Sequence, residues 1–200
     1  MSYIDMRGAV GLTHLFLRER VALGDRVVDA TCGNGQDTLF LARLVGPLGM
    51  VWAFDVQEEA LAKARTHLSE AGCLSRVKLL QAGHEQLAAH VEGPVQAVVF
   101  NLGYLPGSDK ACITLPETTL AALKQSETVL FPGGIIVIAV YTGHPGGREE
   151  GAAVEQWVAS LPYQSYSVWC SRQINRPSTV PYVIVVEKLV PGEQCGQPHL

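Results

Sequence analysis

The sequence predicts an α/β fold: a doubly wound, mostly parallel sheet with helices on both faces. Two observations carry this prediction. Short runs rich in β-branched residues alternate five times with longer runs of helical spacing. Two further β-rich runs follow with no helix between them, which is typical of an antiparallel hairpin. We therefore expect a seven-stranded sheet in which the C-terminal hairpin adds an antiparallel strand near one edge.

Each element is expected from its own residues. Strands are predicted where the apolar runs are short and β-branched, at 26–31, 50–55, 76–81, 95–101, 135–141, 163–171 and 182–188. Helices are predicted where apolar residues recur at helical spacing, at 37–45, 58–71, 85–91, 115–130 and 149–160. Gly72 ends the helix at 58–71, and the stretch Pro132 to Gly134 breaks the helix at 115–130.

Length and composition bound the class of protein. The chain has 200 residues, 48% of them hydrophobic, and a formal net charge of −4. This apolar content fills a core, and the length fits one domain, expected over 1–189 and followed by a flexible tail over 190–200. The mild acidity excludes a binder that relies on overall positive charge, but it leaves a local nucleic-acid-binding patch open.

Targeting and cysteine signals point to the cytoplasm. The sequence contains no run of about 18 apolar residues, and the mixed amphipathic stretch 1–20 lacks the apolar segment of a signal peptide. The five cysteines are scattered, and none forms a Cys-x-x-Cys pair. We therefore expect no disulfide framework, no metal site and no membrane contact.

The first predicted strand runs into a glycine-containing turn, in which two glycines lie between Asp29 and Asp37. Glycine lets the backbone approach a ligand closely at the N-terminus of the following helix. A nicotinamide fingerprint would need glycine where Thr38 stands, and Asp29 would repel a pyrophosphate. Asp29 would instead suit a cationic ligand. A plain strand-to-helix turn is the alternative interpretation of these residues.

A second acidic residue ends the second predicted strand. Asp55 lies 20 residues after Gly35, in the position where a carboxylate accepts both ribose hydroxyls of an adenosine. Gln57 follows closely enough to assist. Because a helix begins just after Asp55, this residue can also act as an N-cap. Together the two elements predict an adenosine-ligand site at the carboxyl ends of the strands.

This pairing resembles the class I S-adenosylmethionine-dependent methyltransferases, which have a Rossmann-like fold. The resemblance implies S-adenosylmethionine (SAM) as the cofactor, with the glycine turn at its methionine part, Asp55 at the ribose and His84 beside the adenine. A helix cap or a surface-loop position is the alternative for His84. The implied cofactor-binding residues are Asp29, Thr31, Gly33, Asn34, Gly35, Gln36, Asp37, Asp55, Gln57, His84 and Glu85.

The fourth predicted strand ends in Phe-Asn-Leu-Gly-Tyr-Leu-Pro-Gly at 100–107. Many amine and nucleobase methyltransferases carry Asn or Asp, two prolines and an aromatic residue at this point. Asn101 and Tyr104 keep their places here, whereas Leu102 and Gly103 replace the prolines. This departure weakens the transfer of the general amine-methyltransferase pattern to this chain.

The longer string is more specific. Together with 29–37, it resembles a bacterial rRNA methylase family whose members include the tRNA 5-aminomethyl-2-thiouridine methyltransferase of the wobble position. The stretch 141–147 with Glu150, and the stretch 175–188, match further strings of that family. The resemblance therefore extends to about residue 189. Val180 departs from the family at a position where a proline is expected.

The resemblance implies methyl transfer from SAM to the primary amine of a 5-aminomethyl group on a thiolated wobble uridine. Asn101 and the Leu102 carbonyl would orient the neutral amine, while Tyr104 packs on the base or closes the pocket. Tyr141 and His144 are candidates for the general base and for substrate contacts. Their alternative role is to shape the loop that follows the fifth strand.

A tRNA anticodon loop is the expected partner, and the C-terminal third offers arginine and aromatic side chains to hold it. Arg172 and Arg176 are the only charged residues between 156 and 186. Arginine and aromatic rings can hold phosphates and a splayed base. The aromatic residues of this region are Tyr163, Tyr166, Trp169 and Tyr182. They alternatively face the core or a homodimer interface.

Other functions stay open at this point. The same cofactor could serve another RNA site, such as rRNA, or a small-molecule amine. An NAD-dependent oxidoreductase and a non-catalytic cofactor-binding module are alternatives from other classes. Thr38 in the glycine turn argues against the oxidoreductase, and the intact motif positions argue against the non-catalytic module.

Overall fold

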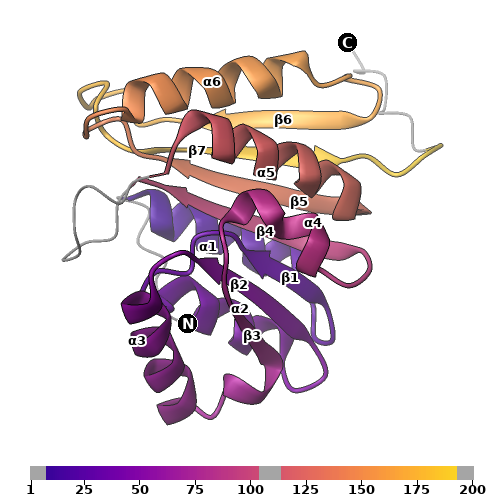
Figure 1. Cartoon of the computed structure of the whole chain (residues 1–200). Helices are drawn as coiled ribbons and strands as arrows, with labels where there is room; N and C mark the ends of the chain where they lie inside the picture. Colours follow the sequence, from indigo (N-terminus) through magenta and orange to yellow (C-terminus); the bar gives the residue numbers. More distant parts are fainter. Residues whose placement is uncertain (1–7, 104–113, 193–200) are drawn as a thin grey trace.

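The computed structural model describes residues 8–103 and 114–192, which build a seven-stranded sheet (Figure 1). Its strand order is β3-β2-β1-β4-β5-β7-β6. The strands are β1 (Arg26–Asp29), β2 (Met50–Asp55), β3 (Val77–Gln81), β4 (Val95–Leu102), β5 (Leu130–Val140), β6 (Tyr166–Ser171) and β7 (Tyr182–Lys188). β1 to β5 are parallel, whereas β7 runs antiparallel to both β5 and β6. The predicted doubly wound sheet with an antiparallel C-terminal hairpin is confirmed.

Helices cover both faces of the sheet (Figure 1). They are α1 (Ala9–Arg20), α2 (Gln36–Val45), α3 (Glu58–Glu70), α4 (Leu87–His90), α5 (Pro116–Val129) and α6 (Gly147–Ser160), with 3-10 turns η1 (Leu74–Arg76) and η2 (His84–Gln86). Residues of α1, α2 and α3 join the core on one face, and residues of α4, α5 and α6 join the core on the other. Each helix therefore buries one apolar stripe against the strands.

The inner strand β5, which lies between β4 and β7, carries no polar residue. Ile136 and Ile138 point into the core under α5 and α6, whereas Ile135 and Val137 point into the core under α1 and α2. All four side chains are almost completely buried. Because successive side chains of a strand face opposite sides, a strand covered on both faces must be apolar at every position.

The strand order reverses between β1 and β4, and this reversal positions the site. The chain leaves β1 through α2 towards β2 on one side, while β4 pairs with β1 on the other side. The loops after β1 and β4 therefore diverge, which leaves a crevice at the carboxyl ends of the strands.

Two strand boundaries differ from the sequence prediction. The first strand was expected over 26–31 but ends at Asp29, after which Cys32 N–H donates to the Phe54 carbonyl. The fifth strand was expected from 135, but it begins at Leu130, before the Pro-Gly-Gly stretch. Its pairing with β4 shifts register between Val95 and Ala97, so the extra residues form an irregularity inside the strand.

Three further segments also differ. The helix expected over 85–91 is divided into η2 and the short α4. The strand expected from 163 starts at Tyr166, because the Pro162 carbonyl accepts the N–H groups of Ser165 and Tyr166 in a turn. The N-terminal stretch, for which no helix was predicted, forms α1 and packs against β5 and β7.

The described ranges also bear on membranes and metals. Between 8 and 103 and between 114 and 192, no helix combines the length and apolar content that a membrane crossing needs. In the same two ranges, no three His, Cys, Asp or Glu side chains are grouped so that they could hold a metal ion. The extent of the domain and the character of the tail stay predictions, because 193–200 lies outside the described residues.

Candidate functional site

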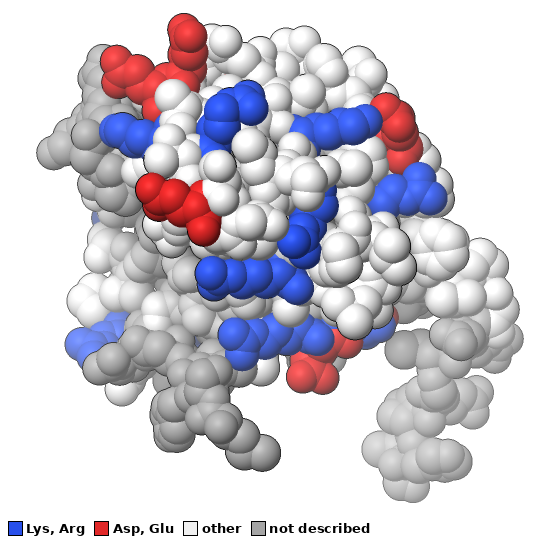
Figure 2. All heavy atoms as spheres, turned by 90° about the horizontal axis from the view of Figure 1, so that it is seen from below, with Lys and Arg blue, Asp and Glu red and all other residues white. Residues whose placement is uncertain are grey.

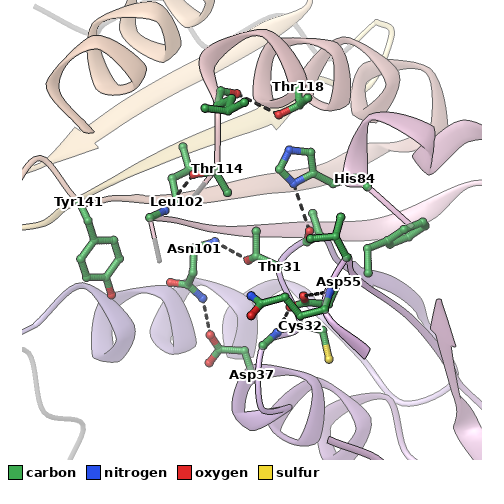
Figure 3. Close-up of a pocket in the computed structure, with 18 of the residues that line it drawn as sticks. Thr31, Cys32, Asp37, Asp55, His84, Asn101, Leu102, Thr114, Thr118 and Tyr141 are labelled. Carbon is green, nitrogen blue, oxygen red and sulfur yellow. Dashed lines mark hydrogen bonds between the residues drawn. The ribbon is translucent and has the colours of Figure 1, made fainter. Parts of the chain in front are cut away.

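A cavity of about 850 Å³ opens at the carboxyl ends of the parallel strands (Figure 3). This volume lies within the range of small-molecule and cofactor sites. The sequence-predicted residues that line it are Thr31, Gly33, Asn34, Gln36, Asp37, Asp55, Gln57, His84, Glu85, Asn101, Tyr141 and His144. The lining does not include Asp29, Gly35, Arg172 or Arg176. Tyr104 lies outside the described residues.

The glycine turn and the second acidic residue meet directly. Gly33 N–H donates to Asp55 Oδ2 at 2.8 Å, and Gln57 N–H donates to Asp55 Oδ1 at 2.9 Å. Each carboxylate oxygen can accept more than one hydrogen bond, so Asp55 keeps capacity for ligand hydroxyls. This carboxylate therefore fixes the turn and faces the cavity at once.

Gly35 serves the packing of two helices. Its φ of +82° begins α2, and a Cβ placed there would lie 2.8 Å from the Cβ of Ala64 in α3. The absence of a side chain thus lets α2 and α3 pack closely, and the cofactor contact expected of Gly35 stays a prediction. Gly33, with a φ of +51°, is the glycine of this turn that lines the cavity.

Asp29 lies beneath the cavity and is completely buried. It accepts hydrogen bonds from Thr31 N–H at 3.1 Å and from Thr38 Oγ1 at 2.6 Å. Burial, and secondly the nearby Asp37 carboxylate, raise the pKa of Asp29 to about 7. The sequence placed Asp29 in the polar network around the cofactor. In the fold Asp29 is joined to the cavity lining through Thr31.

His84 is a buried residue of the cavity wall and lies at the start of η2. Its Nδ1 lies 3.3 Å from the Ala30 carbonyl oxygen, an acceptor, so Nδ1 carries the hydrogen. Burial lowers the pKa of His84 and favours the neutral ring. Its buried Nε2 has no hydrogen-bond partner among the described residues, which leaves an acceptor for a ligand.

Asn101 stands at the end of β4 and is held at two points (Figure 3). Its backbone N–H donates to Thr31 Oγ1 at 2.7 Å, and its side-chain Nδ2 donates to Asp37 Oδ2. Its Oδ1 is buried and has no partner within the described part of the chain. The site thus presents an oriented hydrogen-bond acceptor in the cavity wall.

Tyr141 and His144 follow β5 and line the same cavity. The Tyr141 hydroxyl points to the side on which Asn101 and Asp37 lie (Figure 3). Burial, and secondly Asp37, raise the pKa of Tyr141, so the phenol stays protonated at neutral pH and makes a poor general base. His144 Nδ1 lies 2.9 Å from the Pro145 carbonyl oxygen.

Two polar residues of this region were missed by sequence reasoning as contributors to the site. His14 Nε2 in α1 lies 2.6 Å from Asp37 Oδ1. Glu150 in α6 is buried and accepts hydrogen bonds from Thr114 at 2.8 Å and Thr119 at 2.6 Å. Their partners lie 23 to 36 residues away along the chain, so no local spacing could reveal them.

Arg172 directly follows the edge strand β6 and is engaged by other side chains. It pairs with Glu155 of α6, and its guanidinium lies 3.9 Å from the centroid of the Tyr182 ring. Arg172 and Arg176 give the stretch 156–186 a local charge of +2, but Glu155 lies one residue before that stretch and carries a negative charge beside Arg172. The roles of Arg172 and Arg176 in RNA binding stay predictions.

Comparison with known proteins now becomes informative. The protein family described as "Putative rRNA methylase" matches residues 51–187. This chain belongs to that family. The rRNA methylase family had been expected from the strings at 29–37 and 100–107, and the expectation is confirmed.

Individual members agree with this assignment. An rRNA-methylase from Clostridium thermocellum has a TM-score of 0.90 and 38% identity, over 92% of this chain and all of that one. A methyltransferase from Streptococcus mutans was solved in complex with S-adenosylhomocysteine (SAH). It has a TM-score of 0.84 and 38% identity, and the match covers 92% of this chain and 99% of that chain. The chloroplast tRNA (mnm(5)s(2)U34)-methyltransferase of Arabidopsis thaliana is 41% identical over 84% of this chain. The chain spans 65% of that plant protein's length.

The cavity of this family member fits SAM by its own chemistry. Asp55 offers acceptors for ribose hydroxyls, His84 Nε2 is an unused acceptor, and the buried Asn34 Oδ1 has no partner in the described ranges. An adenosine with a cationic amino-acid part presents donors for such acceptors. These acceptors therefore match the hydroxyl, amino and ammonium donors of SAM.

Proposed function

We propose that this protein transfers a methyl group from SAM to the primary amine of a 5-aminomethyl group on the 2-thiouridine at the wobble position of tRNA. When bound, SAM supplies a methyl group already activated by its sulfonium. The protein must then hold the cofactor, align the amine with the methyl group and keep that amine neutral.

Three loops would hold the cofactor. The turn at Gly33 and Asn34 would contact its methionine part, Asp55 and Gln57 its ribose, and His84 and Glu85 would lie beside its adenine. All six residues line the cavity. The family membership and the SAH complex of the Streptococcus mutans protein support this arrangement.

The acceptor of Asn101 is the observation that carries the proposal. An amine attacks through its lone pair, and its N–H groups must point away from the methyl group. Asn101 Oδ1 is a buried acceptor without a partner among the described residues, so it can take one amine N–H. Leu102 also lines the cavity, and its carbonyl is the second candidate acceptor. Two acceptors would direct the lone pair towards the methyl donor.

A primary alkylamine is largely protonated at neutral pH, so the site must disfavour the ammonium form. The cavity lining supplies apolar walls from Val10, Phe54 and Leu102. Desolvation by such walls lowers the pKa of an amine.

The tRNA anticodon loop is the proposed partner, and the surface charge offers two places for its phosphates. One is the predicted hairpin region with Arg172 and Arg176. The other is the face seen in Figure 2, over which Lys and Arg side chains are spread with some Asp and Glu among them. Arg43 in α2 and Lys63 and Arg65 in α3 are exposed basic residues. Substituting a phosphate contact lowers the slope of log affinity against log salt by about 1.

The function is tested with tRNA from a strain that lacks this enzyme and therefore carries the unmethylated aminomethyl nucleoside. Purified protein and labelled SAM are added, and the tRNA is digested and analysed by nucleoside mass spectrometry. We expect a mass gain of one methyl group on the aminomethyl-thiouridine and none on other nucleosides. Label on another RNA site, or on free alkylamines only, would replace the substrate assignment. Binding of NAD but not of SAM would overturn the enzyme class.

Asn101→Ala provides the matching variant. It removes the oriented acceptor while the cofactor loops stay in place, so affinity for SAH should be unchanged. Misplacing the nucleophile by about 1 Å costs on the order of 100-fold in turnover. Wild-type turnover by Asn101→Ala at saturating SAM would remove Asn101 from the mechanism.

The homodimer and the cytoplasmic location also remain predictions. The edge strand β6 leaves Trp169 71% exposed, beside the exposed Val168 and Cys170. Light scattering on the purified protein checks the dimer. The described cysteines Cys32, Cys73 and Cys170 are free thiols, which fits a reducing compartment.

A further inference from the structure

The N-terminal helix α1 contacts the Asp37–Asn101 pair through His14. His14 Nε2 lies 2.6 Å from Asp37 Oδ1, and Asp37 Oδ2 accepts the Nδ2–H of Asn101. These three residues come from α1, α2 and β4. They form a continuous chain of hydrogen bonds that ends at the acceptor in the cavity wall.

A side-chain amide has a donor end and an acceptor end, and rotation by about 180° exchanges them. In Asn101 the choice between the two orientations is made by Asp37. A carboxylate only accepts, so the NH₂ end of Asn101 turns to Asp37, which leaves the acceptor Oδ1 on the other side of the amide, in a residue that lines the cavity. Without this partner, the amide could present a donor where the substrate also presents donors.

Asp37 is in turn fixed by His14. Its second oxygen is held by the His14 ring, whose orientation is set by stacking on Phe40 with centroids 3.7 Å apart and planes 5° apart. The His14 side chain is 24% exposed and that of Asp37 is 14% exposed. A partly buried, charge-assisted hydrogen bond of this kind restricts the carboxylate to one rotamer.

We propose that His14 is a positioning residue for methyl transfer: it holds Asp37, and Asp37 holds the Asn101 amide with Oδ1 towards the incoming amine. The proposal rests on the proposed function only for the identity of that amine. It assigns a specific role to α1, a helix that lies outside the cofactor motifs.

The variants separate the hydrogen bond from the packing of the ring. His14→Phe keeps a flat ring to stack on Phe40 but removes the donor. His14→Gln loses the ring but restores an N–H donor near the position of Nε2. His67→Phe, in α3 and outside the cavity lining, repeats the first substitution as the matched control.

We expect His14→Phe to lower kcat about tenfold, with KM for tRNA and affinity for SAH within about twofold of wild type. His14→Gln should recover most of the loss, and His67→Phe should match wild type. Wild-type kcat in His14→Phe would overturn the proposal. Equal loss of kcat and SAH affinity in both His14 variants would also overturn it, because it would indicate a structural role only.

A spectroscopic measurement keeps this test independent of the substrate. In ¹⁵N-labelled protein with SAH, the Asn101 side-chain NH₂ signals are assigned by their disappearance in Asn101→Ala. The hydrogen bond to Asp37 should shift one of these protons downfield and slow its exchange, and His14→Phe should reduce both effects. Unchanged signals would overturn the proposal. If the wild-type protein methylates no aminomethyl nucleoside but these signals respond, the proposed function fails while the positioning role stands.

Discussion

Replacing Gly35 by alanine tests whether this glycine serves helix packing. The added Cβ would lie 2.8 Å from Ala64 Cβ and 3.0 Å from Ala64 Cα, and Ala64 is completely buried. Carbon atoms normally pack no closer than about 3.5 Å, so α2 and α3 must separate by several tenths of an ångström. Overpacking of this kind costs about 1–3 kcal/mol, and the left-handed conformation of a non-glycine residue costs about 1–2 kcal/mol more.

Gly24→Ala is the matched control, because Gly24 has a φ of +91° and its Cβ would have nothing within 4 Å. It should lose only the conformational part, about 1–2 kcal/mol, against about 2–5 kcal/mol for Gly35→Ala. Urea unfolding followed by circular dichroism measures both losses. Calorimetry with SAH should show weaker binding for Gly35→Ala alone, since Gly33 and Asn34 of the same turn line the cavity. Equal loss of stability in the two variants would refute the packing argument.

Three further predictions follow from the same contacts. Asp55→Asn should weaken SAH binding about 10- to 150-fold by calorimetry, because a hydrogen bond to a charged group contributes about 1.5–3 kcal/mol. Asp29 has a folded-state pKa of about 7 against an ordinary value of 3.8, so the folded protein holds this proton more tightly. Stability should therefore fall as pH rises from about 4 to about 7, by at most about 1.4 kcal/mol per pH unit, and urea titrations of Asp29→Asn should lack this decline. Glu150→Gln should lose about 1–3 kcal/mol in thermal unfolding, because Glu150 is buried and accepts from two threonines, whereas exposed Glu149→Gln should lose nothing measurable.

The sequence predicted the cofactor side of the site more completely than the substrate side. Gly33, Asp55 and His84 follow successive strands, and the carboxyl ends of parallel strands meet at one edge of the sheet. Once the strands were recognised, these residues had to converge. Gly35 belonged to the same motif but proved to face α3, because a motif does not say which neighbour requires the glycine.

The substrate side depends on contacts between distant parts of the chain. Nothing near His14 marks it as a partner of Asp37, and nothing near Arg172 shows that Glu155 from α6 will pair with it. Sequence patterns report which residues share an element, whereas these pairs join different elements. Their geometry appears only when the helices are packed.

The pattern of residues along the chain was enough to predict the doubly wound sheet, the C-terminal hairpin and the residues at the strand ends. Hydrophobic periodicity and turn-forming residues act over a few positions, so they can be recognised in the sequence. Tertiary packing alone decided which end of the Asn101 amide is held by Asp37 and how deeply Asp29 is buried. Both outcomes depend on hydrogen-bond partners and desolvation supplied by other elements.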